Sequence, residues 1–118
     1  MFVLDSHCDT PTQMLRGLDI GASNSSGQVD ISKLKAGCVD ASFFVLYTPA
    51  DMGEKEATGH ALEMLSLVYD AVKEHEKDIA LAFSPEEALI NKEKGLVSIM
   101  IGMENGSPIR NSLSLLRM

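Results

Sequence analysis

Two short stretches of the 118-residue chain carry side chains that could bind metal ions. The first is Asp5-Ser6-His7-Cys8-Asp9-Thr10-Pro11, and the second is Gly102-Met103-Glu104-Asn105-Gly106. Residues two apart in an extended chain face the same side, so His7 and Asp9 should point together, with Asp5 below them. An imidazole nitrogen and a carboxylate oxygen are good zinc ligands, and Asp5 could orient the His7 ring.

Glu104 adds a second carboxylate, directly after an apolar stretch of the chain. A carboxylate has two oxygens and can bridge two divalent ions, and two zinc ions about 3.5–4 Å apart form a common hydrolytic centre. Taken alone, each motif also fits a solvated acidic turn or a histidine bonded to nearby acids. Taken together, they favour a metal site formed by His7, Asp9 and Glu104, with Glu104 as the candidate catalytic residue.

The remaining reactive side chains form no recognisable site. Alternation along an extended chain points Cys8 away from the proposed ligands, so we expect a packed thiol. His60 and His75 lie fifteen residues apart on a predicted helix and do not make a short ligand pair. The sequence holds no Ser-His-Asp or Cys-His arrangement and no glycine-rich phosphate loop of either common type.

Short apolar runs that alternate with amphipathic stretches must position the candidate ligands. The apolar runs predict strands over residues 2–4, 39–47 and 96–103, and a weaker strand over 79–83. Strands that alternate with helices indicate a mostly parallel sheet with helical crossovers, an α/β fold. In such folds sites form at the carboxyl ends of the strands, where both motifs fall.

Local sequence signals mark the helices between these strands. Asp30 should cap a helix over 31–36, and Ser84-Pro85 should open another that ends near residue 95. Asp51 and Glu54 resemble a capping box ahead of a long helix that reaches residue 76. A last helix should begin at Ser107-Pro108, with Ile109, Leu113 and Leu116 on one face. The polar loop over 17–28 should lie at the surface or over the site.

Composition excludes several classes of partner. The chain has 10 Lys and Arg against 17 Asp and Glu, a formal net charge of −7, and no basic cluster, which excludes a nucleic-acid partner. No apolar run approaches the ~20 residues that span a bilayer, so we expect no membrane partner. The chain begins without a signal-peptide pattern and has two cysteines. We therefore expect a cytoplasmic protein.

The two motifs resemble those of the membrane (renal) dipeptidase family, zinc peptidases of the amidohydrolase-like TIM-barrel type. Gly37-Cys38-Val39-Asp40-Ala41-Ser42-Phe43-Phe44 resembles the family's second strand, and residues 109–118 resemble the helix after its second motif. The resemblance implies that His7 and Asp9 hold one zinc ion and that Glu104 bridges two. A hydroxide between the metals would attack the peptide carbonyl of a dipeptide, including dipeptides with a D-residue at the carboxyl end.

The same resemblance implies that residues 1–118 are the amino-terminal part of an incomplete domain. A (β/α)8 barrel needs roughly 250 residues, so this chain would supply three to four of its parallel strands. In the family, the other zinc ligands and the substrate-binding residues come from later strands. We expect an inactive isolated chain that self-associates or pairs with the missing part of the barrel. The alternatives are an inactive truncated fragment or another amidohydrolase-type metal hydrolase.

Overall fold

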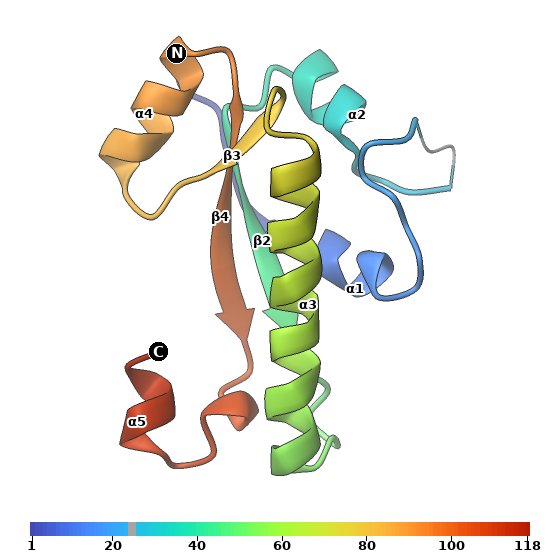
Figure 1. Cartoon of the computed structure of the whole chain (residues 1–118), viewed down its shortest axis with the longest axis vertical. Coiled ribbons are helices and arrows are strands. Elements are labelled where there is room, and N and C mark those ends of the chain that lie inside the picture. The colour runs from blue at the N-terminus through green and yellow to red at the C-terminus, as the bar shows by residue number, and fades with distance from the viewer. Residues whose placement is uncertain (24–25) are drawn as a thin grey trace.

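The computed structural model describes residues 1–23 and 26–118, and within them four parallel strands form one sheet in the order β1-β2-β4-β3 (Figure 1). The expected parallel α/β architecture with helical crossovers is therefore confirmed. The strand pairing places the carboxyl ends of β1, β2 and β4 at one edge of the sheet. The strands are β1 Leu4–Cys8, β2 Ala41–Tyr47, β3 Ile79–Leu81 and β4 Val97–Glu104.

Helices connect the strands, and their starts follow the local signals of the sequence. Asp30 accepts a hydrogen bond from the Lys33 backbone N–H, and Ser84 accepts one from that of Glu87, so both predicted caps are confirmed. The helical segments are α1 Thr10–Met14, α2 Ile31–Ala36, α3 Glu54–Glu74, α4 Pro85–Glu93, η1 Ser107–Ile109, which is a 3₁₀ turn, and α5 Leu113–Leu116.

Three elements differ from the prediction. The first strand was predicted over residues 2–4 but runs over Leu4–Cys8, through the metal motif. Its extent follows from the residues that pair with β2, and not from the apolar run that precedes them. Gly53 is the residue that precedes α3, so the Asp51 capping box is wrong. The last predicted helix is broken into η1 and α5, because Arg110 and Asn111 adopt left-handed backbone conformations between them.

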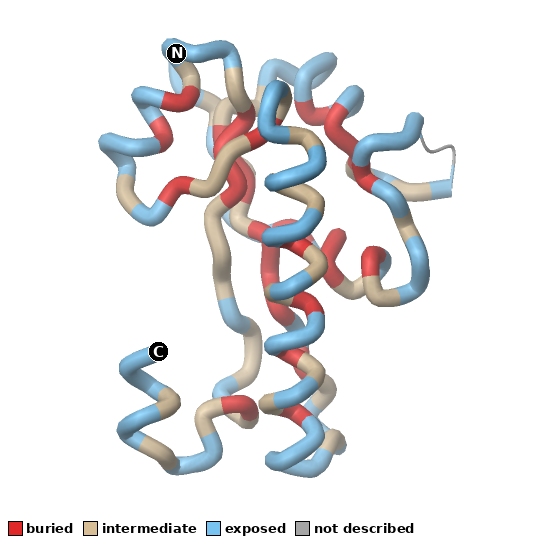
Figure 2. Tube along the Cα trace, in the orientation of Figure 1, coloured by how far each residue is buried: buried red, intermediate tan, exposed pale blue. Residues whose placement is uncertain are grey.

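Helices α3 and α4 cover opposite faces of the sheet. Alternate residues of β4 point to opposite faces. Ile99 is fully buried in the apolar cluster that includes Val68 of α3. Ser98 instead accepts a hydrogen bond of 3.1 Å from the Asn91 side chain of α4. The buried stretches accordingly follow β2, the first part of β4 and the inner side of α3 (Figure 2).

A salt bridge joins three segments at the amino-terminal edge of the sheet. The Lys92 ammonium of α4 lies 2.7 Å from an Asp40 carboxylate oxygen, which also accepts the Val3 backbone N–H at 2.7 Å. The same ammonium lies 5.5 Å from the centre of the Phe2 ring. These contacts hold the segment before β1 against β2 and α4.

No helix in the described part of the chain is long and apolar enough to cross a membrane.

Candidate metal centre

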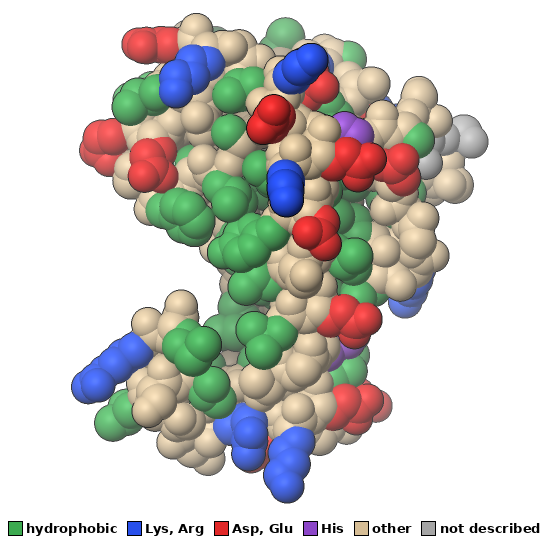
Figure 3. Space-filling model, in the orientation of Figure 1, with side chains coloured by type: hydrophobic (Ala, Val, Ile, Leu, Met, Phe, Trp, Pro, Cys, Tyr) green, Lys and Arg blue, Asp and Glu red, His purple; other side chains and the backbone are tan. Residues whose placement is uncertain are grey.

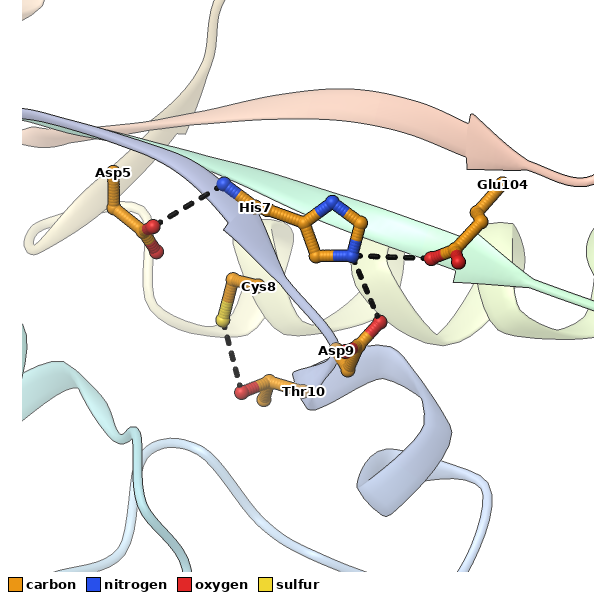
Figure 4. Close-up of polar contacts among 6 residues, drawn as sticks. All are labelled: Asp5, His7, Cys8, Asp9, Thr10 and Glu104. Atoms are coloured by element: carbon orange, nitrogen blue, oxygen red, sulfur yellow. Dashed lines mark hydrogen bonds and ion pairs between the residues drawn. The ribbon is translucent and has the colours of Figure 1, made fainter.

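A register shift in β1 determines which way the first motif points. Asp5 pairs with Ser42 of β2, but Cys8 pairs with Phe44, so three steps along β1 match two steps along β2. The pairing register therefore shifts by one residue between Asp5 and Cys8, as at a β-bulge, and such a shift reverses the alternation of side chains beyond it. Asp5 and Cys8 consequently share one face, and the His7 ring turns to the other, toward the end of β4 (Figure 4).

Two carboxylates meet the same nitrogen of His7 (Figure 4). His7 Nε2 lies 3.1 Å from Glu104 Oε2 and 3.4 Å from Asp9 Oδ1. Asp9 comes directly before α1, and its side chain makes no capping hydrogen bond to that helix. Its carboxylate is therefore directed to His7 and not to the backbone of α1.

The distances among these three groups suit a bound cation. One ligand atom from each residue lies within 4.8 Å of the other two. Two ligands about 2.0–2.2 Å from a tetrahedral ion lie roughly 3.3–3.6 Å apart, close to the contacts of His7. Nε2 carries at most one hydrogen and can donate to one carboxylate at a time. A divalent cation would interact with both acids together and offset their mutual repulsion.

The cluster is open to solvent in this chain. The side chains of His7, Asp9 and Glu104 are 53%, 63% and 45% exposed. Metal ions and small substrates can therefore reach the three groups directly. Beside them, a cavity of about 470 Å³ extends from Asp9 and Gln13 to residues 26–29. The predicted loop over 17–28 thus borders the site through residues 26–28, while residues 24–25 lie outside the described residues.

Asn105 fixes the turn that carries Glu104. Its backbone has a φ of 74°, a left-handed conformation that asparagine tolerates better than most residues. The Asn105 amide donates to the Thr48 carbonyl at 2.9 Å, and its Oδ1 accepts from the Ser107 backbone N–H at 3.1 Å. The ends of β2 and β4 are thereby tied together. Asn105 is not among the predicted ligands, although an asparagine before a glycine is a turn signal.

The sequence placed His7, Asp9 and Glu104 in one site, and the structure brings them together. Asp5 lies elsewhere than expected: its carboxylate accepts hydrogen bonds from the His7 backbone N–H and the Ser42 hydroxyl, and it does not contact the His7 ring. The predicted packed thiol is confirmed, since Cys8 is 5% exposed and its Sγ lies 3.2 Å from Thr10 Oγ1.

The fold is that of solved metallopeptidases. A structure described as the dipeptidase AC superposes with a TM-score of 0.86 at 20% identity, over 99% of this chain and 40% of that one. A metallo peptidase from Rhodobacter sphaeroides, liganded with a phosphinate mimic of the dipeptide L-Ala-D-Ala, gives 0.86 at 18% identity, over 99% and 42%. At these identities the likeness establishes the fold.

Sequence comparisons agree with the fold. Dipeptidase 3 of Rattus norvegicus is 29% identical over 98% of this chain and 24% of its own length. Dipeptidase ataJ of Aspergillus terreus is 29% identical over 98% of this chain and 32% of its own length. The chain thus spans about a quarter to a third of these curated relatives. The family described as membrane dipeptidase (Peptidase family M19) matches residues 1–118.

Proposed function

The chain belongs to the membrane dipeptidase family, Peptidase family M19, and on this basis we propose that it forms part of a zinc-dependent dipeptidase. The observation that carries the proposal is the convergence of one imidazole nitrogen and two carboxylates within 4.8 Å at the carboxyl edge of the sheet. Nitrogen and oxygen donors in this arrangement suit zinc. The substrates are small dipeptides, in keeping with the names of the relatives.

Each of the three residues has a separate role in the proposed site. His7 and Asp9 would hold one zinc ion, and Glu104 would contribute its carboxylate to that ion and to a second one. Two bound zinc ions would supply Lewis-acid polarisation of the peptide carbonyl and an activated water as the nucleophile. Asn105 keeps the Glu104 carboxylate facing His7 through its hydrogen bond to Thr48.

The proposed site needs residues beyond those of 1–118. Residues 1–118 supply the amino-terminal part of the barrel, since the relatives are about three to four times longer. Three ligands divided between two ions leave coordination positions for the rest of the barrel, or for a second copy, to fill. The isolated chain is therefore an inactive fragment until that remaining part is present. The proposed compartment of the protein is the cytoplasm.

The test measures hydrolysis of L-Ala-L-Ala and L-Ala-D-Ala by the 118-residue chain with added Zn²⁺, against a sample treated with a chelator. Chelator-sensitive turnover supports the dipeptidase and means that association supplies the missing ligands. Folded protein that binds Zn²⁺ through His7 without turnover supports a partial site in an inactive fragment. Folded protein that neither binds Zn²⁺ nor hydrolyses either dipeptide contradicts the proposal.

Two substitutions locate any metal that binds. His7→Ala removes the imidazole at the centre of the cluster, and His60→Ala removes a histidine of α3 outside it. Zn²⁺ binding and any turnover should be lost in His7→Ala and kept in His60→Ala. Equal Zn²⁺ binding by the two variants would place the metal elsewhere.

A further inference from the structure

The β-bulge in β1 decides on which face of the sheet His7 lies. Asp5 pairs with the buried Ser42, which shares a face of β2 with Phe44, the residue opposite Cys8. Regular alternation from Asp5 would turn His7 to that same buried face. The extra residue turns His7 to the opposite face, where Glu104 lies at the end of β4 (Figure 4). The His7–Glu104 contact therefore depends on the bulge.

A bulge interrupts the regular hydrogen bonding between strands, and a side chain can replace the lost partner. In β1 that side chain is Asp5. Its Oδ1 accepts the His7 backbone N–H at 3.2 Å, and its Oδ2 accepts the Ser42 hydroxyl at 2.8 Å. Ser42 is fully buried in the neighbouring strand. The carboxylate is thus fixed by β2 while it holds the backbone of His7.

We infer that Asp5 is a positioning residue that keeps β1 in its bulged register and thereby directs the His7 ring to the metal cluster. Asp5 acts through the backbone of His7 and is not among the three residues whose ligand atoms converge, which are His7, Asp9 and Glu104. The metal part of this inference rests on the function proposed above. The conformational part concerns the chain alone.

Asp40 provides a matched control at the other end of the same pair of strands. Its carboxylate also accepts one backbone N–H, from Val3, and one side-chain donor, Lys92. Asp40 lies at the amino-terminal edge of the sheet, away from the cluster. Asp40→Ala should therefore lower thermal stability and leave metal affinity unchanged, whereas Asp5→Ala should lower metal affinity.

The experiment titrates Co²⁺ and Zn²⁺ alone into the wild-type chain and into Asp5→Ala, Asp5→Asn, Ser42→Ala and Asp40→Ala, following cobalt absorption and heat of binding. Loss of a group that orients a metal ligand typically weakens binding about 10- to 100-fold, the effect we expect for Asp5→Ala. Asp5→Asn keeps an acceptor for His7 N–H and should restore most of the affinity and the wild-type cobalt spectrum. Ser42→Ala should have an intermediate effect.

Amide hydrogen exchange of His7 tests the conformational part without any metal. Exchange at the His7 N–H should accelerate in Asp5→Ala and remain slow in Asp5→Asn and Asp40→Ala. Wild-type metal affinity in folded Asp5→Ala together with unchanged exchange at His7 would overturn the inference. Failure of the wild-type chain to bind either metal would contradict the proposed site, and the His7 exchange rates would still decide whether Asp5 positions His7.

Discussion

The three candidate ligands differ in how strongly the chain holds them. His7 lies within the bulge, where Asp5 holds its backbone N–H, and Glu104 ends β4 beside a turn that Asn105 fixes. Asp9 occupies the junction between β1 and α1 and makes no capping hydrogen bond. Asp9 can therefore adjust its carboxylate most easily when a metal binds, whereas His7 and Glu104 are already oriented toward each other.

Glu104→Gln tests the carboxylate that we propose to bridge two ions. The amide keeps the size of the side chain but loses the charge and one of the two acceptor oxygens. Zn²⁺ affinity should fall by at least about tenfold, because the proposed site loses a ligand. Calorimetric titration of the wild-type chain and the variant measures the change. Glu63→Gln changes an exposed acid of α3 as the control, and unchanged Zn²⁺ stoichiometry and affinity in Glu104→Gln would remove Glu104 from the site.

The residue types and their order were enough to predict which side chains lie together, but not which face of the sheet each side chain occupies. His7, Asp9 and Glu104 were predictable because carboxyl ends of parallel strands share one edge of a sheet. The position of Asp5 was not predictable, because a bulge depends on the partner strand and leaves no mark in the spacing of His7 and Asp9. Simple alternation predicts Asp5 and His7 on the same face of the sheet, whereas the structure has them on opposite faces.

At the scale of elements, two of the three local cap signals were reliable, the one at Asp51 was not, and signals that depend on distant contacts were missed. The caps at Asp30 and Ser84 are local hydrogen bonds and were predicted correctly. The start of β1 depends on pairing with β2, and the break at Arg110 depends on how η1 packs against α3. Neither contact is encoded in the neighbouring residues, so both boundaries were missed.

The salt bridge between Lys92 of α4 and Asp40, the residue before β2, predicts a pH dependence of stability. The hydrogen bond from Lys92, followed by that from the Val3 N–H, holds the pKa of Asp40 below its usual 3.8. The pKa of the Asp40 carboxyl is therefore higher in the unfolded chain than in the folded one. Its contribution to stability is complete above pH 3.8 and is lost as the pH falls through the folded pKa. Melting temperatures of the wild-type chain should therefore decline as the pH falls below 3.8.

Two variants assign that decline to the salt bridge. Asp40→Asn cannot titrate and should show a smaller decrease in melting temperature over the same acid range. Lys92→Met removes the largest cause of the lowered pKa and should reduce the decrease as well. A decline that is identical in the wild-type chain and in both variants would show that other carboxyl groups govern acid unfolding.

The contact between Gly21 and His75 predicts opposite effects of the same substitution at two glycines. An alanine Cβ at Gly21 would overlap the His75 ring, so Gly21→Ala should destabilise the chain by about 1–3 kcal/mol. Gly59 lies inside α3 with open space around its Cβ position, and Gly59→Ala should stabilise by about 0.5–1 kcal/mol. Urea unfolding measures both changes.

A third variant tests whether His75 causes the effect at Gly21. Gly21→Ala should cost little in a His75→Ala background, because the ring that the new methyl group meets is gone. The result matters for the site, since the loop that Gly21 belongs to borders the cavity beside His7 through residues 26–28. An equal cost of Gly21→Ala in both backgrounds would trace the destabilisation to the backbone of the loop.

At the scale of the whole molecule, the sheet is only partly paired. In the part of the chain that the structure describes, β1 pairs with β2 alone, and β3 pairs only with the Val97–Ile99 segment of β4. Among the described residues, the remainder of β4, up to Glu104, has β2 on one side and no strand on the other. The face between α4 and α5 is hollowed and carries hydrophobic side chains (Figure 3).

These open edges predict association of the isolated chain. Unpaired strand edges and exposed apolar side chains favour contact with another chain. Phe83, which follows β3, is 70% exposed, and Met103, near the end of β4, is 48% exposed. Sedimentation velocity should therefore show dimers or larger species whose share rises with protein concentration, and Met103→Lys should lower that share by placing a charge among the apolar side chains of the hollow beside α5.

Tyr69→Lys is the control for an added charge, since Tyr69 is 43% exposed and lies on α3 and not on a strand. It should associate as the wild-type chain does. The site links this measurement to function, because Glu104 follows Met103 on the same strand. If added chain completes the metal site, Zn²⁺ affinity should increase with protein concentration in the wild-type chain and remain low in Met103→Lys. A monodisperse wild-type monomer at high concentration would contradict association through these edges.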